Sequence, residues 1–253
     1  MTIFYFSGTG NSKYIAQLFA KEMAAACYSI EDPLDFGQIL AHEEQIAVCY
    51  PIYGSRLPKP MRDWTKTNSQ ALKGKKLVIF CTQWLFSGDG ARAFTDLLPP
   101  NHTKVIYAQH FFMPNNINNL FFLPVAGEKS IAKYQKRAQA KMKQVCAHIQ
   151  AGKVRRQGFH PISRALGLVQ GASFPKIEKR AAHKVWLGQN CNACQLCLHI
   201  CPVENFKCLD GKISTNNNCA LCYRCINTCP QKAISVWFRA KVRRQYRGMQ
   251  STL

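Results

Sequence analysis

The residues Thr2-Ile-Phe-Tyr-Phe-Ser-Gly-Thr-Gly-Asn-Ser12 open the chain with an apolar run that passes into a turn rich in glycine and hydroxyl groups. The β-branched and aromatic residues 2–6 predict a buried β-strand, and residues 13–26 have the composition of a helix. A strand, a glycine-rich turn and a helix N-terminus form a cradle for a phosphate group, because backbone N–H groups and the helix dipole favour an anion.

This turn departs from two common phosphate-binding motifs. Lys13 stands where a G-x-G-x-x-G run needs its third glycine, and no G-x4-G-K-[ST] run is formed. The turn instead resembles the flavodoxin phosphate loop, [ST]-x-T-G-N-[ST], at the first strand–turn–helix of the chain, where that family has it. The resemblance implies FMN, with its phosphate held by Ser7, Gly8, Thr9, Gly10, Asn11 and Ser12. A glycine-rich turn that binds nothing is the alternative.

Apolar runs later in the chain predict further strands of the same sheet. Residues 45–50 and 76–82 are almost continuously apolar, as parallel strands buried on both faces are, and residues 103–109 are another candidate. Residues 129–150 carry apolar residues at helical spacing. Strands that alternate with helices predict an α/β fold with a doubly wound parallel sheet, in agreement with the flavodoxin resemblance.

Two loops follow these strands at the edge where doubly wound sheets bind their ligands. They span residues 51–58 and 83–90. In flavodoxin-like proteins the corresponding loops flank the isoalloxazine ring with aromatic side chains and backbone amides. By position, the resemblance implies these further cofactor contacts: Pro51, Tyr53, Gly54, Trp84, Gly88, Asp89 and Gly90. Tyr53 and Trp84 could equally be aromatic residues packed under a loop.

Eight of the thirteen cysteines form two runs of the same spacing near the C-terminus. Each run reads C-x2-C-x2-C-x3-C-P. Zinc sites usually show paired C-x2-C arms instead, and a disulfide framework needs an oxidising compartment. The two runs consist of Cys191, Cys194, Cys197 and Cys201, and of Cys219, Cys222, Cys225 and Cys229.

These runs resemble those of bacterial two-cluster ferredoxins over about residues 186–238. The resemblance implies two [4Fe–4S] clusters, and in such proteins the fourth cysteine of each run ligates the other cluster. One cluster is then expected on Cys191, Cys194, Cys197 and Cys229. The other is expected on Cys219, Cys222, Cys225 and Cys201.

Both ends of the chain together resemble flavodoxin–ferredoxin fusion proteins. We expect a flavodoxin-like FMN-binding domain over residues 1–150, a basic linker over 151–185, a small α+β ferredoxin-like two-cluster domain over 186–238 and a basic tail over 239–253. The sequence contains no run of 18 apolar residues and no signal-peptide pattern. Free thiols and cluster ligands suit a reducing compartment, so we expect a cytoplasmic protein.

The formal net charge is +21, whereas flavodoxins and ferredoxins are usually acidic. The charge is densest in residues 151–190, which hold eight Lys or Arg residues and one acidic residue. Such a field favours acidic partners. We expect an acidic redox partner protein first and a peripheral contact with an anionic membrane second. Nucleic acid is the least favoured, because no nucleic-acid-binding module accompanies the basic tail. A solvated basic surface would explain the charge without a partner.

Two functions fit these expectations. The first is an electron-transfer protein that relays electrons between FMN and the clusters, to or from a redox partner, because a flavin handles two electrons and each cluster one. The alternative is a flavin-dependent reductase of a small-molecule substrate, fed by its own clusters. A pocket rimmed by residues 83–90 and 110–122 would favour the reductase. A flavin ring edge buried against the cysteine-rich domain would favour the relay.

Overall fold

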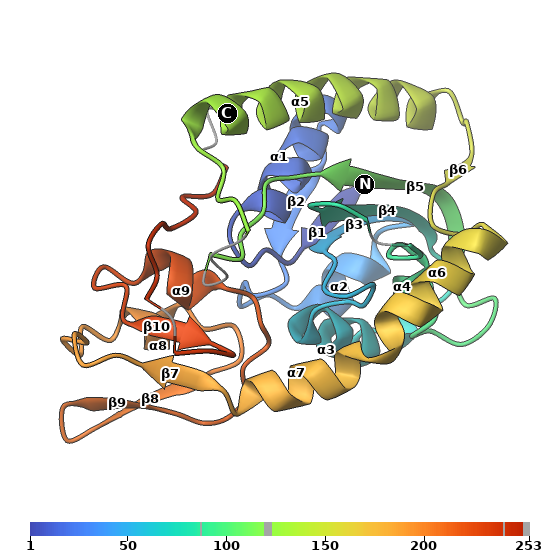
Figure 1. The fold of residues 1–253 in the computed structure, drawn as a ribbon. Coiled ribbons are helices and arrows are strands. Elements are labelled where there is room, and N and C mark those ends of the chain that lie inside the picture. Colours follow the sequence, from blue (N-terminus) through green and yellow to red (C-terminus); the bar gives the residue numbers. More distant parts are fainter. Residues whose placement is uncertain (87, 119–122, 240, 250–253) are drawn as a thin grey trace.

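The computed structural model describes residues 1–86, 88–118, 123–239 and 241–249. Its N-terminal part is a six-stranded parallel sheet with the strand order β2-β1-β3-β4-β5-β6 (Figure 1). The order reverses between β1 and β3, which is the switch point where doubly wound sheets bind ligands. The strands are β1 (Thr2–Tyr5), β2 (Ala26–Ser29), β3 (Gln45–Pro51), β4 (Lys76–Gln83), β5 (Lys104–Phe112) and β6 (Arg155–Arg156).

Helices cover both faces of this sheet (Figure 1). One face packs against α1 (Asn11–Met23) and α5 (Glu128–Gln150). The other face packs against α2 (Phe36–Ala41), α3 (Lys59–Thr67) and the short α4 (Arg92–Thr95).

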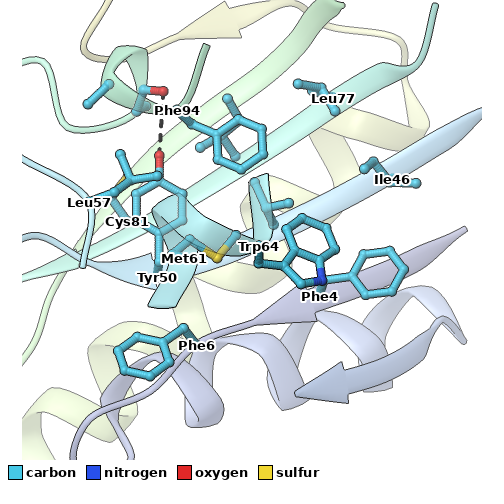
Figure 2. Packing of buried hydrophobic residues seen from close by; sticks show 14 of the residues in the cluster. Phe4, Phe6, Ile46, Tyr50, Leu57, Met61, Trp64, Leu77, Cys81 and Phe94 are labelled. Atoms are coloured by element: carbon cyan, nitrogen blue, oxygen red, sulfur yellow. Dashed lines mark hydrogen bonds between the residues drawn. The ribbon is translucent and has the colours of Figure 1, made fainter. Parts of the chain in front are cut away.

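The central strand β3 shows how the two cores are separated. Ile46 and Tyr50 pack into the core beneath α2, α3 and α4, whereas Ala47 and Cys49 pack into the core beneath α1 and α5. This alternation follows from the pleat of the strand. Figure 2 shows the first of these cores, in which the Tyr50 hydroxyl donates a hydrogen bond of 3.5 Å to the Ala91 carbonyl oxygen.

The strands predicted at 2–6, 45–50, 76–82 and 103–109 and the helix predicted at 129–150 are confirmed, with small shifts of their ends. Strands β2 and β6 were not predicted. The residues of β2 are half-buried or exposed, and β6 consists of two exposed arginines, so neither has the apolar pattern of a buried strand.

The range 151–185, expected to be a linker, folds into regular elements. After β6 come α6 (Pro161–Ala172) and α7 (Phe174–Ala182), and together they lead from the sheet to the C-terminal part (Figure 1). Pro161 and Pro175 lie in the first turns of these helices. The N–H groups of a first turn have no partner within the helix, so the missing N–H group of proline costs no hydrogen bond there.

The described residues of the C-terminal part form two small antiparallel sheets and two short helices. Strand β7 pairs with β10, and β8 forms a hairpin with β9. A separate hydrophobic cluster, which includes Phe174, Phe206, Leu221 and Ile234, holds it together. Its elements are β7 (Val185–Leu187), α8 (Leu196–His199), β8 (Phe206–Leu209), β9 (Lys212–Thr215), α9 (Arg224–Thr228) and β10 (Ile234–Val236).

Candidate functional site

The predicted phosphate loop leads from β1 into α1. Ser7 Oγ accepts a hydrogen bond of 3.0 Å from the Gly10 N–H and so closes the turn. Gly10 has a φ of 97°, a left-handed conformation that favours glycine. In the described part of the chain no side chain caps the N-terminus of α1, and its first turn holds no acidic residue. Its N–H groups therefore form a site suited to an anion.

A cavity of about 500 Å³ lies beside this loop, a size typical of small-molecule and cofactor sites. The loops that follow β3 and β4, at the carboxyl ends of these strands, line part of the cavity. Nine of the thirteen predicted cofactor-binding residues line it: Ser7, Gly8, Thr9, Asn11, Ser12, Pro51, Tyr53, Gly54 and Trp84. Gly10 lines a neighbouring hollow on the same loop.

The other three predicted residues lie apart from the cavity wall. A Cβ atom added to Gly88 would lie 2.7 Å from the Gly167 nitrogen of α6. The Asp89 side chain is buried against Gly167, and this burial raises the pKa of the Asp89 carboxyl. The Gly90 carbonyl oxygen accepts the hydrogen bond from Tyr50. All three positions therefore serve contacts within the protein.

Two polar atoms on the cavity wall lack hydrogen-bond partners among the described residues. They are the Tyr53 hydroxyl and Gln83 Oε1, and both are buried. Burial also raises the pKa of Tyr53 well above its usual range. A buried polar group without a partner destabilises a protein, so a ligand that satisfies these atoms would be favoured.

Sequence reasoning did not name the other residues of the wall individually, although some of them lie in the loops that it indicated. Asn116 Nδ2 donates a hydrogen bond of 3.0 Å to Thr9 Oγ1 and ties segment 114–117 to the phosphate loop. The sequence indicated this segment only as part of a rim at 110–122, of which residues 119–122 lie outside the described residues. The missed wall residues are Ile52, Thr82, Gln83, Pro114, Asn115, Asn116, Ile117, Phe174, Ile177, Leu221, Tyr223, Trp237 and Phe238.

The second cysteine run closes one side of the cavity. Leu221 and Tyr223, which flank Cys222 in the sequence, are part of the wall. The Cys222 carbonyl oxygen packs against Gly8 so closely that a Cβ atom at this position would collide with it. Glycine at position 8 thus allows the cysteine-rich loop to touch the phosphate loop.

Arg224 links the same two loops and was not singled out from the sequence. Its guanidinium donates hydrogen bonds to the carbonyl oxygens of Ser7 at 2.8 Å and Gly8 at 3.2 Å. It also pairs with Glu31 at 2.6 Å and donates to the Ile200 carbonyl oxygen at 2.8 Å. Burial lowers the pKa of Arg224, but the hydrogen bond and charge of the Glu31 carboxylate outweigh this effect and raise it. The guanidinium therefore stays charged.

The eight cysteines of the two runs gather into two sets. Cys191, Cys194, Cys197 and Cys229 line one cleft, which Cys225 also reaches. Cys201 lies among the electrostatic neighbours of Cys219, Cys222 and Cys225. Burial, strengthened by the neighbouring thiols, raises the pKa of Cys197 to about 11 and that of Cys219 to about 12. Within the described residues, no three His, Cys, Asp or Glu side chains converge as the ligands of a single metal ion do.

The backbone around the two runs repeats itself. Three pairs of non-glycine residues, each pair 28 positions apart, adopt the left-handed conformation that such residues seldom adopt. Cys191 and Cys219 are separated by the same number of positions. The two cysteine loops therefore have the same local geometry. The pairs, with their φ values, are Ala193 (53°) and Leu221 (55°), Gln195 (61°) and Tyr223 (59°), and Glu204 (49°) and Lys232 (51°).

The tail beyond β10 folds back over the phosphate loop. The buried Tyr246 donates a hydrogen bond of 2.6 Å from its hydroxyl to Asn11 Oδ1. Gly248 lies so near Thr9 that an added Cβ atom would stand 2.8 Å from the Thr9 carbonyl oxygen. Residues 241–249 are thus a strap across the loop rather than a free extension.

No helix in the described ranges of the chain is both long enough and apolar enough to cross a bilayer. The family model of the flavodoxin domain matches residues 2–165. No curated protein matches the chain.

Among solved structures, the chain is similar to flavodoxin 2 of Bacillus cereus, with 16% identity, a TM-score of 0.41, and coverage of 58% of this chain and 97% of that one. It is also similar to the two-electron reduced flavodoxin of Megasphaera elsdenii, with 21% identity, a TM-score of 0.38, and coverage of 56% and 98%. Both matches leave more than two fifths of this chain uncovered.

Proposed function

The chain belongs to the flavodoxin domain family, and on that premise we propose that it is an electron-transfer protein whose residues hold FMN and two [4Fe–4S] clusters. With these groups bound, the protein would relay electrons between the flavin and the clusters, and to or from a redox partner. The cavity is lined by residues from 83–90 and 110–122, as expected for a reductase, and by the second cysteine run, as expected for a relay. The contact with the cysteine run supports the relay. Leu221 and Tyr223 wall the cavity, and the Cys222 backbone touches Gly8.

The cavity fits FMN in both its polar and its apolar parts. Residues Ser7 to Ser12 and the N-terminus of α1 would hold the phosphate. Pro51, Tyr53, Gly54 and Trp84 would contact the ring, with the unpartnered Tyr53 hydroxyl and Gln83 Oε1 available to its polar groups. Gly88, Asp89 and Gly90 are left out of this set because their contacts are with the protein itself.

The C-terminal part fits two clusters with exchanged fourth ligands, as in two-cluster ferredoxins. Cys229 shares a cleft with Cys191, Cys194 and Cys197, and Cys201 neighbours the three other cysteines of the second run. Backbone N–H groups donate to the sulfurs of both exchanged cysteines, from Asn205 to Cys201 at 3.2 Å and from Ala233 to Cys229 at 3.4 Å. Such hydrogen bonds stabilise thiolate ligands and tune cluster potentials.

Bound FMN would accept or donate two electrons, one at a time, and each cluster would accept or donate one electron. The residues of this chain would hold these groups in neighbouring parts of the protein. Arg224 fixes the second cysteine loop on the phosphate loop, and the strap of residues 241–249 covers that loop. Tyr223 and Leu221 form the side of the cavity that faces the cysteines, where their apolar surfaces would keep water from the bound flavin.

Anaerobic reconstitution followed by metal and flavin analysis tests the proposal. We expect one FMN and about eight irons per chain, since each cluster holds four. A count of about four irons, or zinc alone, would overturn the two-cluster assignment. Folded protein that ignores excess FMN would overturn the flavin assignment.

The FMN phosphate contact is tested by Thr9→Ala, which should weaken FMN binding by about tenfold, because it removes a hydroxyl group from the loop. Thr103→Ala, at the amino end of β5 and outside the cavity, is the matched control and should bind FMN as the unchanged protein does. Many turnovers of a small molecule without any partner protein would favour the alternative, a flavin-dependent reductase.

A further inference from the structure

Helix α6 carries its large apolar side chains on the outside. Gly167 and Gly171 face the protein and are buried. Four large apolar side chains of α6 face solvent. Ile162 (65% exposed), Leu166 (47%) and Val169 (79%) share one side of the helix, and Leu168 (49%) lies apart from them. An ordinary surface helix has the opposite arrangement, with its apolar side turned to the core.

The orientation of α6 is fixed by close contacts. A Cβ atom at Gly167 would collide with the Asp89 carboxylate, and one at Gly171 would lie 2.6 Å from Arg56 Nε. Ser55 Oγ donates a hydrogen bond of 2.5 Å to Gln170 Oε1. The contact of Gly167 with the buried Asp89 and the hydrogen bond of Gln170 therefore hold α6 with its large apolar side chains turned away from the protein.

The neighbouring loop extends this apolar surface. Gln170 Nε2 donates a hydrogen bond of 3.4 Å to the Phe86 carbonyl oxygen, which places residues 85–86 beside α6. The side chains of Leu85 and Phe86 are themselves exposed. We call Leu85, Phe86, Ile162, Leu166 and Val169 the α6 face. Single exposed apolar residues are ordinary, but a contiguous group marks a contact surface.

Cationic side chains are frequent on α6 and on the elements that adjoin it in sequence, β6 and α7. Arg164 lies on α6 itself, Lys176 and Lys179 lie on α7, and Arg155 and Arg156 lie on β6, and all five are exposed. The one acidic residue of the range 151–190 is Glu178, which Arg62 pairs with at 2.6 Å. The charge of the range 151–190 is therefore strongly positive.

This combination selects one class of occupant. A second copy of the chain would bring together two molecules that each carry a formal charge of +21. An anionic bilayer instead attracts the cations and accepts aliphatic and aromatic side chains at its interface, where monotopic helices bury their apolar side. We propose that the α6 face docks on an anionic lipid membrane.

The position of α6 is compatible with the proposed electron transfer without depending on it. Figure 1 shows α6 on the far side of the molecule from β8, β9 and the cysteine runs. The cysteine-rich part therefore stays accessible to a redox partner when α6 lies on a membrane.

Vesicle co-sedimentation of the full chain tests this proposal. We expect binding to vesicles of phosphatidylcholine with phosphatidylglycerol and not to phosphatidylcholine alone. Leu166→Ser with Val169→Ser should lower the partition coefficient about tenfold or more, because apolar burial at the interface is lost. Leu209→Ser, at an exposed leucine on β8, is the control and should bind as the unchanged protein does.

A second pair of variants tests how much the cationic side chains contribute to vesicle binding. Arg164→Gln with Lys176→Gln should weaken binding to anionic vesicles by several-fold, since each cation near the surface adds to the attraction. Lys73→Gln with Lys76→Gln, at the amino end of β4, removes the same charge elsewhere and should have little effect. Thermal unfolding followed by circular dichroism checks that every variant is folded.

Three results would overturn the proposal. The first is equal vesicle binding by the Leu166→Ser, Val169→Ser protein and the unchanged protein. The second is self-association in sedimentation velocity that these substitutions abolish, which would assign the face to a second copy. The third is an acidic protein whose binding requires Leu166 and Val169 while anionic vesicles do not bind.

Discussion

Arg224 connects two parts of the chain that are more than 200 residues apart in sequence. We expect Arg224→Met to lower the free energy of unfolding by about 2 kcal/mol, because it leaves the Glu31 carboxylate and the carbonyl groups of Ser7 and Gly8 without their donor in a partly buried setting. Denaturant unfolding measures the change. Lys59→Met is the control: its pair with Asp63 is exposed, so the loss should stay below about 0.5 kcal/mol. Equal small losses in both variants would mean that Arg224 does not hold the two parts together.

Gly8 is the other residue on which this contact depends. A Cβ atom at this position would collide with the Cys222 carbonyl oxygen and lie 2.8 Å from the Tyr53 hydroxyl. We expect Gly8→Ala to push the cysteine loop away from the phosphate loop and to weaken FMN binding about tenfold or more, since the cavity wall moves. Titration of FMN fluorescence measures the affinity. Gly127→Ala, where nothing lies within 4 Å, should bind FMN normally, and equal affinities of the two variants would contradict this account.

At the scale of elements, the sequence predicted those whose residues carry a periodic pattern. Strands β1, β3, β4 and β5 are apolar because both of their faces are buried, and the phosphate loop follows β1 directly. The range 151–185 was interpreted as a linker because its glycines and prolines resemble breaks. In the structure two of those glycines are the contact side of α6 and two prolines begin helices. Leu221 and Tyr223 form part of the cavity wall, and Arg224 binds the phosphate loop, only through tertiary contacts. No local sequence pattern encodes such contacts.

The repeated cysteine loops allow a test of the exchanged ligands. If Cys201 belongs with the second run, Cys201→Ala together with Cys222→Ala damages one cluster, and about four irons per chain should remain. Cys201→Ala together with Cys194→Ala then damages both clusters and should leave almost none. Iron analysis of the anaerobically reconstituted proteins distinguishes the two double variants. The reverse pattern would show that each run binds a cluster by itself.

At the scale of the whole molecule, the basic tail lies beside the first cysteine set. Gln245 Nε2 donates a hydrogen bond of 2.7 Å to the Cys229 carbonyl oxygen, and the neighbouring Arg243 and Arg244 are exposed. Cys194 of the same set is exposed as well. A partner that exchanges electrons at this set would therefore approach through a field of positive charge, and we propose that this partner is an acidic protein.

This proposal makes electron exchange with an acidic flavodoxin or ferredoxin depend on salt. The rate in stopped-flow mixing should fall clearly as ionic strength rises, because salt screens opposite charges over a Debye length of ~8 Å near physiological conditions. Arg243→Gln with Arg244→Gln should slow the exchange several-fold at low salt and flatten the salt response, since charges near the contact steer the encounter. Lys73→Gln with Lys76→Gln removes the same net charge at the amino end of β4 and should change the rate far less. Exchange with a neutral small-molecule donor should not respond to salt. A flat response with the acidic carrier would mean that the +21 formal charge serves solvation rather than docking.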